Sequence, residues 1–135
     1  MKRYLLDTGI AQDFINARRG VRNQIDERRH NGCRIGICVP VLGELWSGIE
    51  GSASRERNMH LLRHALSRLV LWPYSSDAAE EFGRLFAELR RIGRAMQQID
   101  IQIAAIALSL GNCTVVSSDS DLAAVPGLAV ENWAA

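Results

Sequence analysis

Lysine is almost absent from this chain of 135 residues, and its scarcity excludes several kinds of phosphate chemistry. The sixteen basic residues comprise fifteen arginines and Lys2 alone. A P-loop requires a Gly-Lys-[Ser/Thr] sequence, which does not occur. Phosphoaspartyl phosphatases and receiver domains, by their family patterns, need a lysine at the sheet edge, whereas Lys2 precedes the first expected strand. Arginine suits phosphate contacts in nucleic acids, and genomic base composition explains the same bias equally well.

Cysteines and long apolar runs are also few. Cys33, Cys38 and Cys113 are odd in number and lack a Cys-x-x-Cys spacing, so they predict neither a disulfide framework nor a zinc knuckle. No apolar run approaches the roughly 18 to 20 residues of a membrane span. The first residues reach an acid, Asp7, too soon to form the apolar region of a signal peptide. We therefore expect one globular domain over residues 1–135, located in the cytoplasm and without a membrane partner.

Short β-branched runs alternate with helical segments along the whole chain. This alternation predicts an α/β fold with a central parallel sheet of four to five short strands flanked by helices. We expect strands at Arg3–Leu6, Arg34–Val39, Val70–Trp72, Thr114–Ser117 and Val130–Trp133. We expect helices at Ile10–Ala17, Val21–Asn31, Pro40 to Gly48–Gly51, Ser54 to about Leu69, Ser75 or Ser76 to Gly93, and Gln97–Leu110. The last of these is apolar nearly all round, which is typical of a buried helix.

Four acidic residues occupy related positions in this pattern. Asp7 follows the first strand, Glu44 follows the second, and Asp119 follows the fourth. Asp100 lies near the start of the apolar helix. In an open α/β sheet these positions converge on the carboxyl edge, where ligands bind. Carboxylates gathered there repel one another unless a cation holds them, so the pattern predicts a site for Mg²⁺ or Mn²⁺.

Each acid also has an interpretation that needs no ligand. Asp7 can cap a helix, and Glu44 lies in the first turns of its helix, where an acid is favourable. Asp119 and Asp121 can form an ordinary Asx turn. Asp100 is harder to explain, because an unpaired carboxylate among isoleucines needs a cation, a partner or a proton. Its neighbours on the same helical face would leave room for a ligand, namely Gln97, Ala104 and Ala107.

Two further features have a functional and a plain interpretation. His60 and His64 are spaced four residues apart with Glu56 one turn earlier, which allows a zinc site, although no further histidine or cysteine lies nearby. A solvated helix face is the simpler interpretation. Trp46, two residues after Glu44, is a packing residue or a platform on which a base stacks.

Several segments, taken in order, resemble the PIN-domain family, and within it the VapC-type toxin ribonucleases of bacterial toxin–antitoxin pairs. Tyr4-Leu5-Leu6-Asp7-Thr8 is similar to the family's first strand and first acid, and Val41-Leu42-Gly43-Glu44-Leu45, continuing to Gly48, to its Glu-Leu-x-x-Gly helix. Asp100-Ile101-Gln102-Ile103-Ala104-Ala105 resembles the Asp-x-x-Ile-Ala-Ala helix. The segments from Ser117 to Leu122, Val125 to Leu128 and Glu131 to Trp133 resemble its terminal pattern. The resemblance covers nearly the whole chain.

The resemblance implies a PIN-like three-layer fold and a metal-dependent endoribonuclease that hydrolyses RNA, with tRNA or rRNA as the target class. The implied catalytic and metal-binding residues are Asp7, Glu44, Asp100 and Asp119, with Asp121 also at the metal and Thr8 and Ser117 in support. One or two Mg²⁺ or Mn²⁺ ions would activate water, and hydrolysis would leave a 5′-phosphate and a 3′-hydroxyl. The implied partners are RNA, a cognate antitoxin whose own domain contacts DNA, and a second copy of the chain.

One residue departs from the family pattern. The family usually has Asn, sometimes Ser, after the Asp-Thr pair, and this chain has Gly9. A missing polar side chain beside the first acid allows an alternative, in which the chain is a catalytically weak or inactive PIN-like module that binds RNA or a protein partner.

Overall fold

The computed structural model describes residues 1–135 and contains a five-stranded sheet in which every neighbouring pair of strands is parallel. The strands are β1 (Arg3–Leu6), β2 (Arg34–Cys38), β3 (Val70–Trp72), β4 (Cys113–Val116) and β5 (Ala129–Glu131). Their order in the sheet is β3-β2-β1-β4-β5. The α/β class, the parallel sheet and its upper strand number are therefore confirmed.

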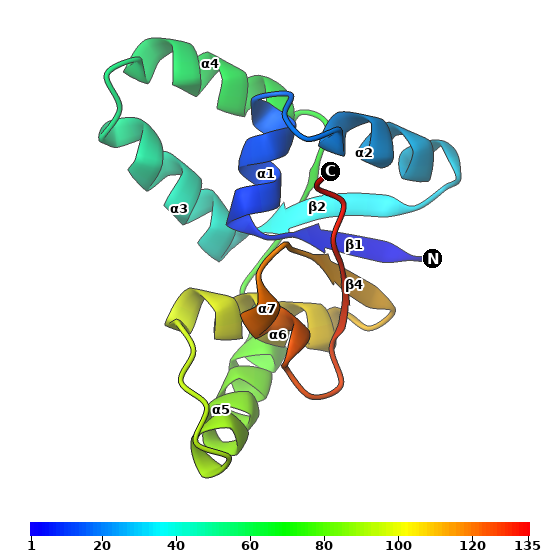
Figure 1. Cartoon of the computed structure of the whole chain (residues 1–135), viewed down its shortest axis with the longest axis vertical. Helices are drawn as coiled ribbons and strands as arrows, with labels where there is room; N and C mark the ends of the chain where they lie inside the picture. Colours follow the sequence, from blue (N-terminus) through cyan, green and yellow to red (C-terminus); the bar gives the residue numbers. More distant parts are fainter.

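Seven helices cover the two faces of the sheet. They are α1 (Thr8–Ile15), α2 (Val21–His30), α3 (Val39–Glu50), α4 (Arg55–Leu66), α5 (Ser76–Arg91), α6 (Gln98–Leu110) and α7 (Ser120–Ala123). Successive connections from β1 to β3 run toward one edge of the sheet, and those from β3 onward run toward the other. Because such crossovers are right-handed, α1 to α4 lie on one face and α5 to α7 on the opposite face, above and below the sheet in Figure 1.

The strand order places a topological switch point between β1 and β4. From β1 the chain moves outward to β2 and β3, and it then returns to add β4 on the other side of β1. The carboxyl ends of β1 and β4 are joined in register, with Leu6 opposite Val116, and the Asp7 amide donates to the Val116 carbonyl at 3.0 Å. A crevice outside the carboxyl ends at such a point is the expected place for a ligand.

The core explains why the strands are short and β-branched. Leu5, Ile37 and Val115 are fully buried, as expected for parallel strands that helices cover on both faces. Gly36 in β2 is required for close approach, because a Cβ atom there would lie 2.1 Å from the Val70 carbonyl oxygen of β3. No helix combines the length and the apolarity that a membrane crossing would require.

Element boundaries differ from the expected ones where a local contact decides them. Helix α1 begins at Thr8 because the Asp7 side chain caps it, and it ends at Ile15, two residues before Ala17 adopts a positive φ of 54°. The second strand ends at Cys38, and Val39 already belongs to α3, with Pro40 in the first turn. The short helix α7 stands where the sequence pattern predicted only a turn.

Candidate active site

The structure brings the five predicted acids together. A cavity of about 310 Å³ at the carboxyl edge is lined by residues from four parts of the chain, namely Asp7, Thr8, Gly9, Glu44, Gln97, Ile99, Asp100, Ser118, Asp119 and Asp121. Ser117 is buried behind this lining and contacts it through a hydrogen bond. We refer to this space as the acid cavity.

Asp7 both caps α1 and faces the acid cavity. Its Oδ1 atom accepts a hydrogen bond from the Ile10 amide at 2.8 Å, and its Oδ2 atom accepts one from the Ser117 hydroxyl at 2.5 Å. Burial raises the pKa of Asp7, and the charge of Asp119 adds to the rise, while the bonds from Ser117 and Ile10 oppose it. The capping interpretation and the site interpretation are therefore compatible, since each uses a different carboxylate oxygen.

The turn after β4 presents two acids in a fixed arrangement. The Asp119 amide donates to the Ser117 hydroxyl at 2.9 Å, and the Asp121 amide donates to the Asp119 Oδ1 atom at 2.9 Å. Ser117 thus links this turn to Asp7 on the neighbouring strand. The Asx turn that the sequence allowed is present, and it caps α7.

Glu44 reaches the cavity from α3. The Thr8 hydroxyl donates a hydrogen bond to the Glu44 carboxylate, which joins the first turn of α1 to the second turn of α3. Glu44 is exposed to solvent. Thr8, which the family resemblance places in a supporting position, therefore fixes the orientation of an acid on a different element.

Asp100 has the least compensated charge of the group. It is the third residue of α6, half-buried, and burial raises its pKa to about 6. The negative charges of Asp119, Asp7, Asp121 and Glu44 contribute to the same rise. No hydrogen bond lowers it, so a cation or a proton is the remaining means of neutralising this carboxylate.

The donor set fits a hard divalent cation. Asp100, Asp119 and Asp121 each offer one carboxylate oxygen, and these three atoms lie within 4.8 Å of one another. Asp7 and Glu44 line the same cavity. Because every one of these donors is a carboxylate oxygen, the set favours Mg²⁺ or Mn²⁺ over the softer metals that prefer sulfur or imidazole ligands.

The sequence patterns did not identify Arg94 as part of this site. Its place near the end of α5 had a sufficient explanation in the helix macrodipole. In the structure, Gly93 turns the chain with a φ of 74°, and the Arg94 Nη2 atom donates to the Asp121 Oδ1 atom at 2.8 Å. The Arg94 Nε atom is buried and has no partner. No local signal distinguishes Arg94 from Arg90 or Arg91, since only the turn aims it at the acids.

Three sequence-based expectations need correction or refinement. Gln97 lines the acid cavity beside Asp100, as expected from its place before α6, but Ala104 and Ala107 are buried in the core and do not line it. His60 and His64 are exposed on α4 and belong to no group of three potential metal ligands. Trp46 is half-buried with the Arg63 guanidinium 5.7 Å from its ring centre, which favours the packing interpretation.

Comparison with known proteins identifies the family. The PIN domain profile matches residues 4–128. Ribonuclease VapC2 of Haemophilus influenzae is 34% identical over 134 residues, covering 98% of this chain and 99% of that protein. The tRNA(fMet)-specific endonuclease VapC of Shigella flexneri is 33% identical over the same length, with the same coverage of 98% and 99%.

A solved structure has the same fold over nearly its whole length. The crystal structure of VapBC2 from Rickettsia felis, bound to a DNA fragment from their promoter, contains a chain that is 31% identical with a TM-score of 0.91. The match covers 97% of this chain and 98% of that chain. The chain described here therefore belongs to the PIN-domain family, in its VapC group.

Proposed function

We propose that this protein is a metal-dependent endoribonuclease toxin, which hydrolyses RNA phosphodiester bonds and is inhibited by a cognate antitoxin. Two of its relatives are named as a ribonuclease and as a tRNA-specific endonuclease, and both align with nearly the whole chain. A solved neighbour is a VapBC complex. These similarities support the reaction class and the existence of an antitoxin partner.

One observation within the chain supports the chemistry most directly. Asp7, Glu44, Asp100 and Asp119 come from four separate parts of the sequence, and the fold places all of them around one cavity. Arg94 is the single positively charged side chain that forms an ion pair with this group. Such an excess of carboxylates is unfavourable in the isolated protein, and a bound cation would offset it.

We assign the metal to the five acids of the cavity. One carboxylate oxygen from each of Asp100, Asp119 and Asp121 lies within 4.8 Å of the others, and Asp7 and Glu44 line the same cavity. The chemistry that Mg²⁺ or Mn²⁺ would supply, when bound, is activation of a water molecule and neutralisation of charge on the phosphodiester. Ser117 holds the Asp7 carboxylate in one orientation, and Thr8 holds that of Glu44. No histidine lines the cavity, so the carboxylates are the candidates for accepting a proton.

The proposed substrate is tRNA or rRNA, cut to leave a 5′-phosphate and a 3′-hydroxyl. The name of the Shigella flexneri relative specifies tRNA(fMet), which favours tRNA among these classes. We further expect a homodimer in the cytoplasm and an antitoxin whose own domain contacts promoter DNA, as the DNA-bound Rickettsia felis complex suggests.

Gly9 motivates a second candidate function, that of a catalytically weak or inactive module that binds RNA or a partner. Gly9 lines the acid cavity, and a Cβ atom there would lie 3.8 Å from the Asp7 Oδ1 atom. The polar side chain that the family usually carries would therefore stand beside the first acid. Its absence removes a hydrogen-bonding group from the site and leaves the five acids in place.

A cleavage assay separates the two candidates. The purified protein, stripped of metal with EDTA, should leave total RNA intact and should cleave it after Mn²⁺ or Mg²⁺ is added. Sequencing of the new 5′-phosphate ends would identify the target and its cleavage motif. Expression alone should arrest bacterial growth, and coexpression of the antitoxin encoded beside it should restore growth. Binding of Mn²⁺ without any RNA cleavage would instead support the non-catalytic module.

A further inference from the structure

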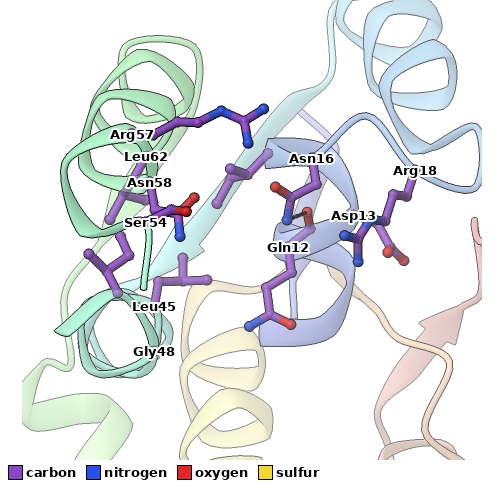
Figure 2. Close-up of a pocket in the computed structure, with 12 residues that line it drawn as sticks. Gln12, Asp13, Asn16, Arg18, Leu45, Gly48, Ser54, Arg57, Asn58 and Leu62 are labelled. Carbon is purple, nitrogen blue, oxygen red and sulfur yellow. Dashed lines mark hydrogen bonds between the residues drawn. The ribbon is translucent and has the colours of Figure 1, made fainter. Parts of the chain in front are cut away.

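A second cavity of about 450 Å³ lies between α1, α3 and α4. Figure 2 shows Arg57 and Asn58 on α4 across this space from Gln12 on α1 and from Asn16, the residue after α1. The half-buried Ile15 contributes apolar surface, Leu45 and Leu62 line the space from the buried core, and most of the remaining lining is polar. We refer to this space as the helix groove, because helices form its sides.

The helix groove lies next to the acid cavity along α1 and α3. Thr8 and Glu44 join α1 to α3 at the acid cavity, and Gln12 and Gly48 lie four residues farther along the same two helices. Residues four apart share a helical face and are separated by about 6 Å along the axis. A polymer strand at the acid cavity would therefore reach the helix groove by passing over the Thr8–Glu44 contact along α1 and α3.

Gly48 keeps this groove open. It lies inside α3 without a positive φ, and a Cβ atom there would have no neighbouring atom within 4 Å. The backbone therefore does not require glycine at this position. Because Gly48 lines the groove, a larger side chain would fill the space between α1 and α3.

The charged groups of the groove favour a phosphate-bearing ligand. Arg18 and Arg57 are exposed, and neither belongs to an ion pair. Asp13 is the one carboxylate in the lining, so the local charge is positive. Unpaired guanidinium groups bind phosphate oxygens with two hydrogen bonds, and side-chain amides such as that of Gln12 can bind ribose hydroxyls or base edges.

We propose that the helix groove binds the RNA strand on one side of the scissile bond, with Arg18 and Arg57 on its phosphates. Ile15 then contacts the apolar face of a ribose or base, and Gly48 provides the space for the strand. This assignment rests on the proposed ribonuclease function and adds a substrate-binding surface to it. The groove fixes the position of the strand relative to the acids, while the acids perform the chemistry.

The first test removes the two positive charges. Binding of fluorescein-labelled tRNA is measured in EDTA, where cleavage does not interfere, for the double variant Arg18→Gln, Arg57→Gln. We expect its affinity to fall by about tenfold or more, and the slope of log affinity against log salt to decrease by roughly 1.4, about 0.7 for each single-strand phosphate contact. The control variant Arg29→Gln, Arg91→Gln makes the same charge change at exposed arginines that line neither cavity, and it should bind nearly as well as the wild type.

The second test closes the groove without changing charge. Gly48→Leu should weaken tRNA binding and raise the KM for cleavage, while the stabilisation of the fold by Mn²⁺ stays at the wild-type value. Gly83→Leu is the matched control, because Gly83 also lies in a helix, is exposed and has open space around its Cβ position. It should change neither property.

Equal tRNA affinity in the arginine double variant and its control would overturn the proposal. It would also be overturned if the groove variants lose antitoxin binding and keep tRNA binding, because the groove would then belong to the protein partner. These outcomes are distinct from failure of the ribonuclease function, in which the wild type binds tRNA in EDTA and never cleaves it after Mn²⁺ is added.

Discussion

Helix α5 and the acid cavity both contain carboxylates and an arginine that pairs with them, but they differ in how many of the carboxylates are paired. On α5, Arg84 lies between two acids, with its nitrogens 2.7 Å from Glu81 and 3.3 Å from Glu88. In the acid cavity, five carboxylates share one ion pair, that of Arg94 with Asp121 at 2.8 Å. On α5 both Glu81 and Glu88 form an ion pair, whereas in the cavity only Asp121 does.

This difference indicates which acids serve the fold and which serve a ligand. Exposed pairs such as those of Arg84 contribute only about 0.2 to 0.5 kcal/mol each and need no further partner. Asp100 is half-buried, and its burial together with the charges of the neighbouring carboxylates raises its pKa to about 6, which disfavours the charged form. A group that lowers stability in the isolated protein has to be explained by what binds there.

Replacing Asp100 should have the largest effect on activity. Asp100→Asn removes a metal-ligating charge and should lower RNA cleavage by about 100-fold or more. The variant should stay folded and be more stable than the metal-free wild type, because it relieves repulsion among the acids. Single-turnover cleavage and thermal melting in EDTA measure the two effects. The matched change on α5, Glu81→Gln, should leave cleavage unaltered, and wild-type activity in Asp100→Asn would remove this residue from the site.

The stability difference between the wild type and Asp100→Asn should depend on pH. The folded-state pKa of Asp100, about 6, is raised above its unfolded value of about 3.9. The stability contributed by the protonated carboxyl is therefore fully present below pH 3.9 and is lost as the pH rises through about 6. In EDTA the two proteins should be equally stable near pH 4, and above pH 6 the wild type should be less stable by on the order of 1 kcal/mol after solvent screening.

Manganese should reverse this loss, since its binding requires deprotonated carboxylates. The increase in the melting temperature of the wild type caused by Mn²⁺ should grow between pH 5 and pH 7. At 100 times the Kd the stabilisation is about 2.7 kcal/mol. Asp7→Asn and Asp119→Asn should show a smaller increase. Equal increases in all three proteins would place the metal elsewhere.

Arg94→Met removes the one positive charge that forms an ion pair with an acid of the cavity, and it keeps most of the volume of the side chain. The metal-free variant should lose about 0.5 to 1 kcal/mol of stability, because Asp121 loses its partner. Mn²⁺ should then stabilise Arg94→Met more than the wild type, since more negative charge is left to neutralise. Arg84→Met on α5 should be destabilised by a similar or smaller amount, and Mn²⁺ should stabilise it as much as it stabilises the wild type. If Mn²⁺ stabilises both variants equally, the unpaired acids of the cavity are not what distinguishes it from α5.

The smallest effect is expected at Gly9. Gly9→Asn restores the polar side chain that the family usually carries, and a Cβ atom there would lie at an ordinary 3.8 Å from the Asp7 Oδ1 atom. Because Gly9 is in the first turn of α1, the change should stabilise the fold by about 0.4 to 1 kcal/mol. Cleavage should be equal or higher with the same dependence on Mn²⁺. Loss of cleavage with retained metal binding would show that the substrate backbone needs the space at Gly9.

Much of the fold could be predicted from the sequence because its signals are local. The strand Arg3–Leu6 and the strand Val70–Trp72 have the bounds that their apolar runs predict. Ser75 caps α5 by accepting a hydrogen bond from the Ala78 amide, as its position suggested. The end of α1 could not be predicted, since the positive φ of Ala17 arises only in the folded turn. The sequence allowed the Asx turn at Asp119 and Asp121, but it did not indicate that this turn caps the short helix α7.

Three features follow from the sequence alone: the class of fold, the placement of four acids after strands or near helix starts, and the resemblance to the PIN-domain family. They do so because hydrophobic period and strand–helix order depend on residues that are close together in the chain. The tertiary structure alone decided which atoms meet. It joined Ser117 to Asp7 across neighbouring strands, Thr8 to Glu44 across two helices, and Arg94 to Asp121 through the turn at Gly93. It also opened the helix groove beside the acids, which no local pattern encodes, because such contacts depend on how distant segments pack.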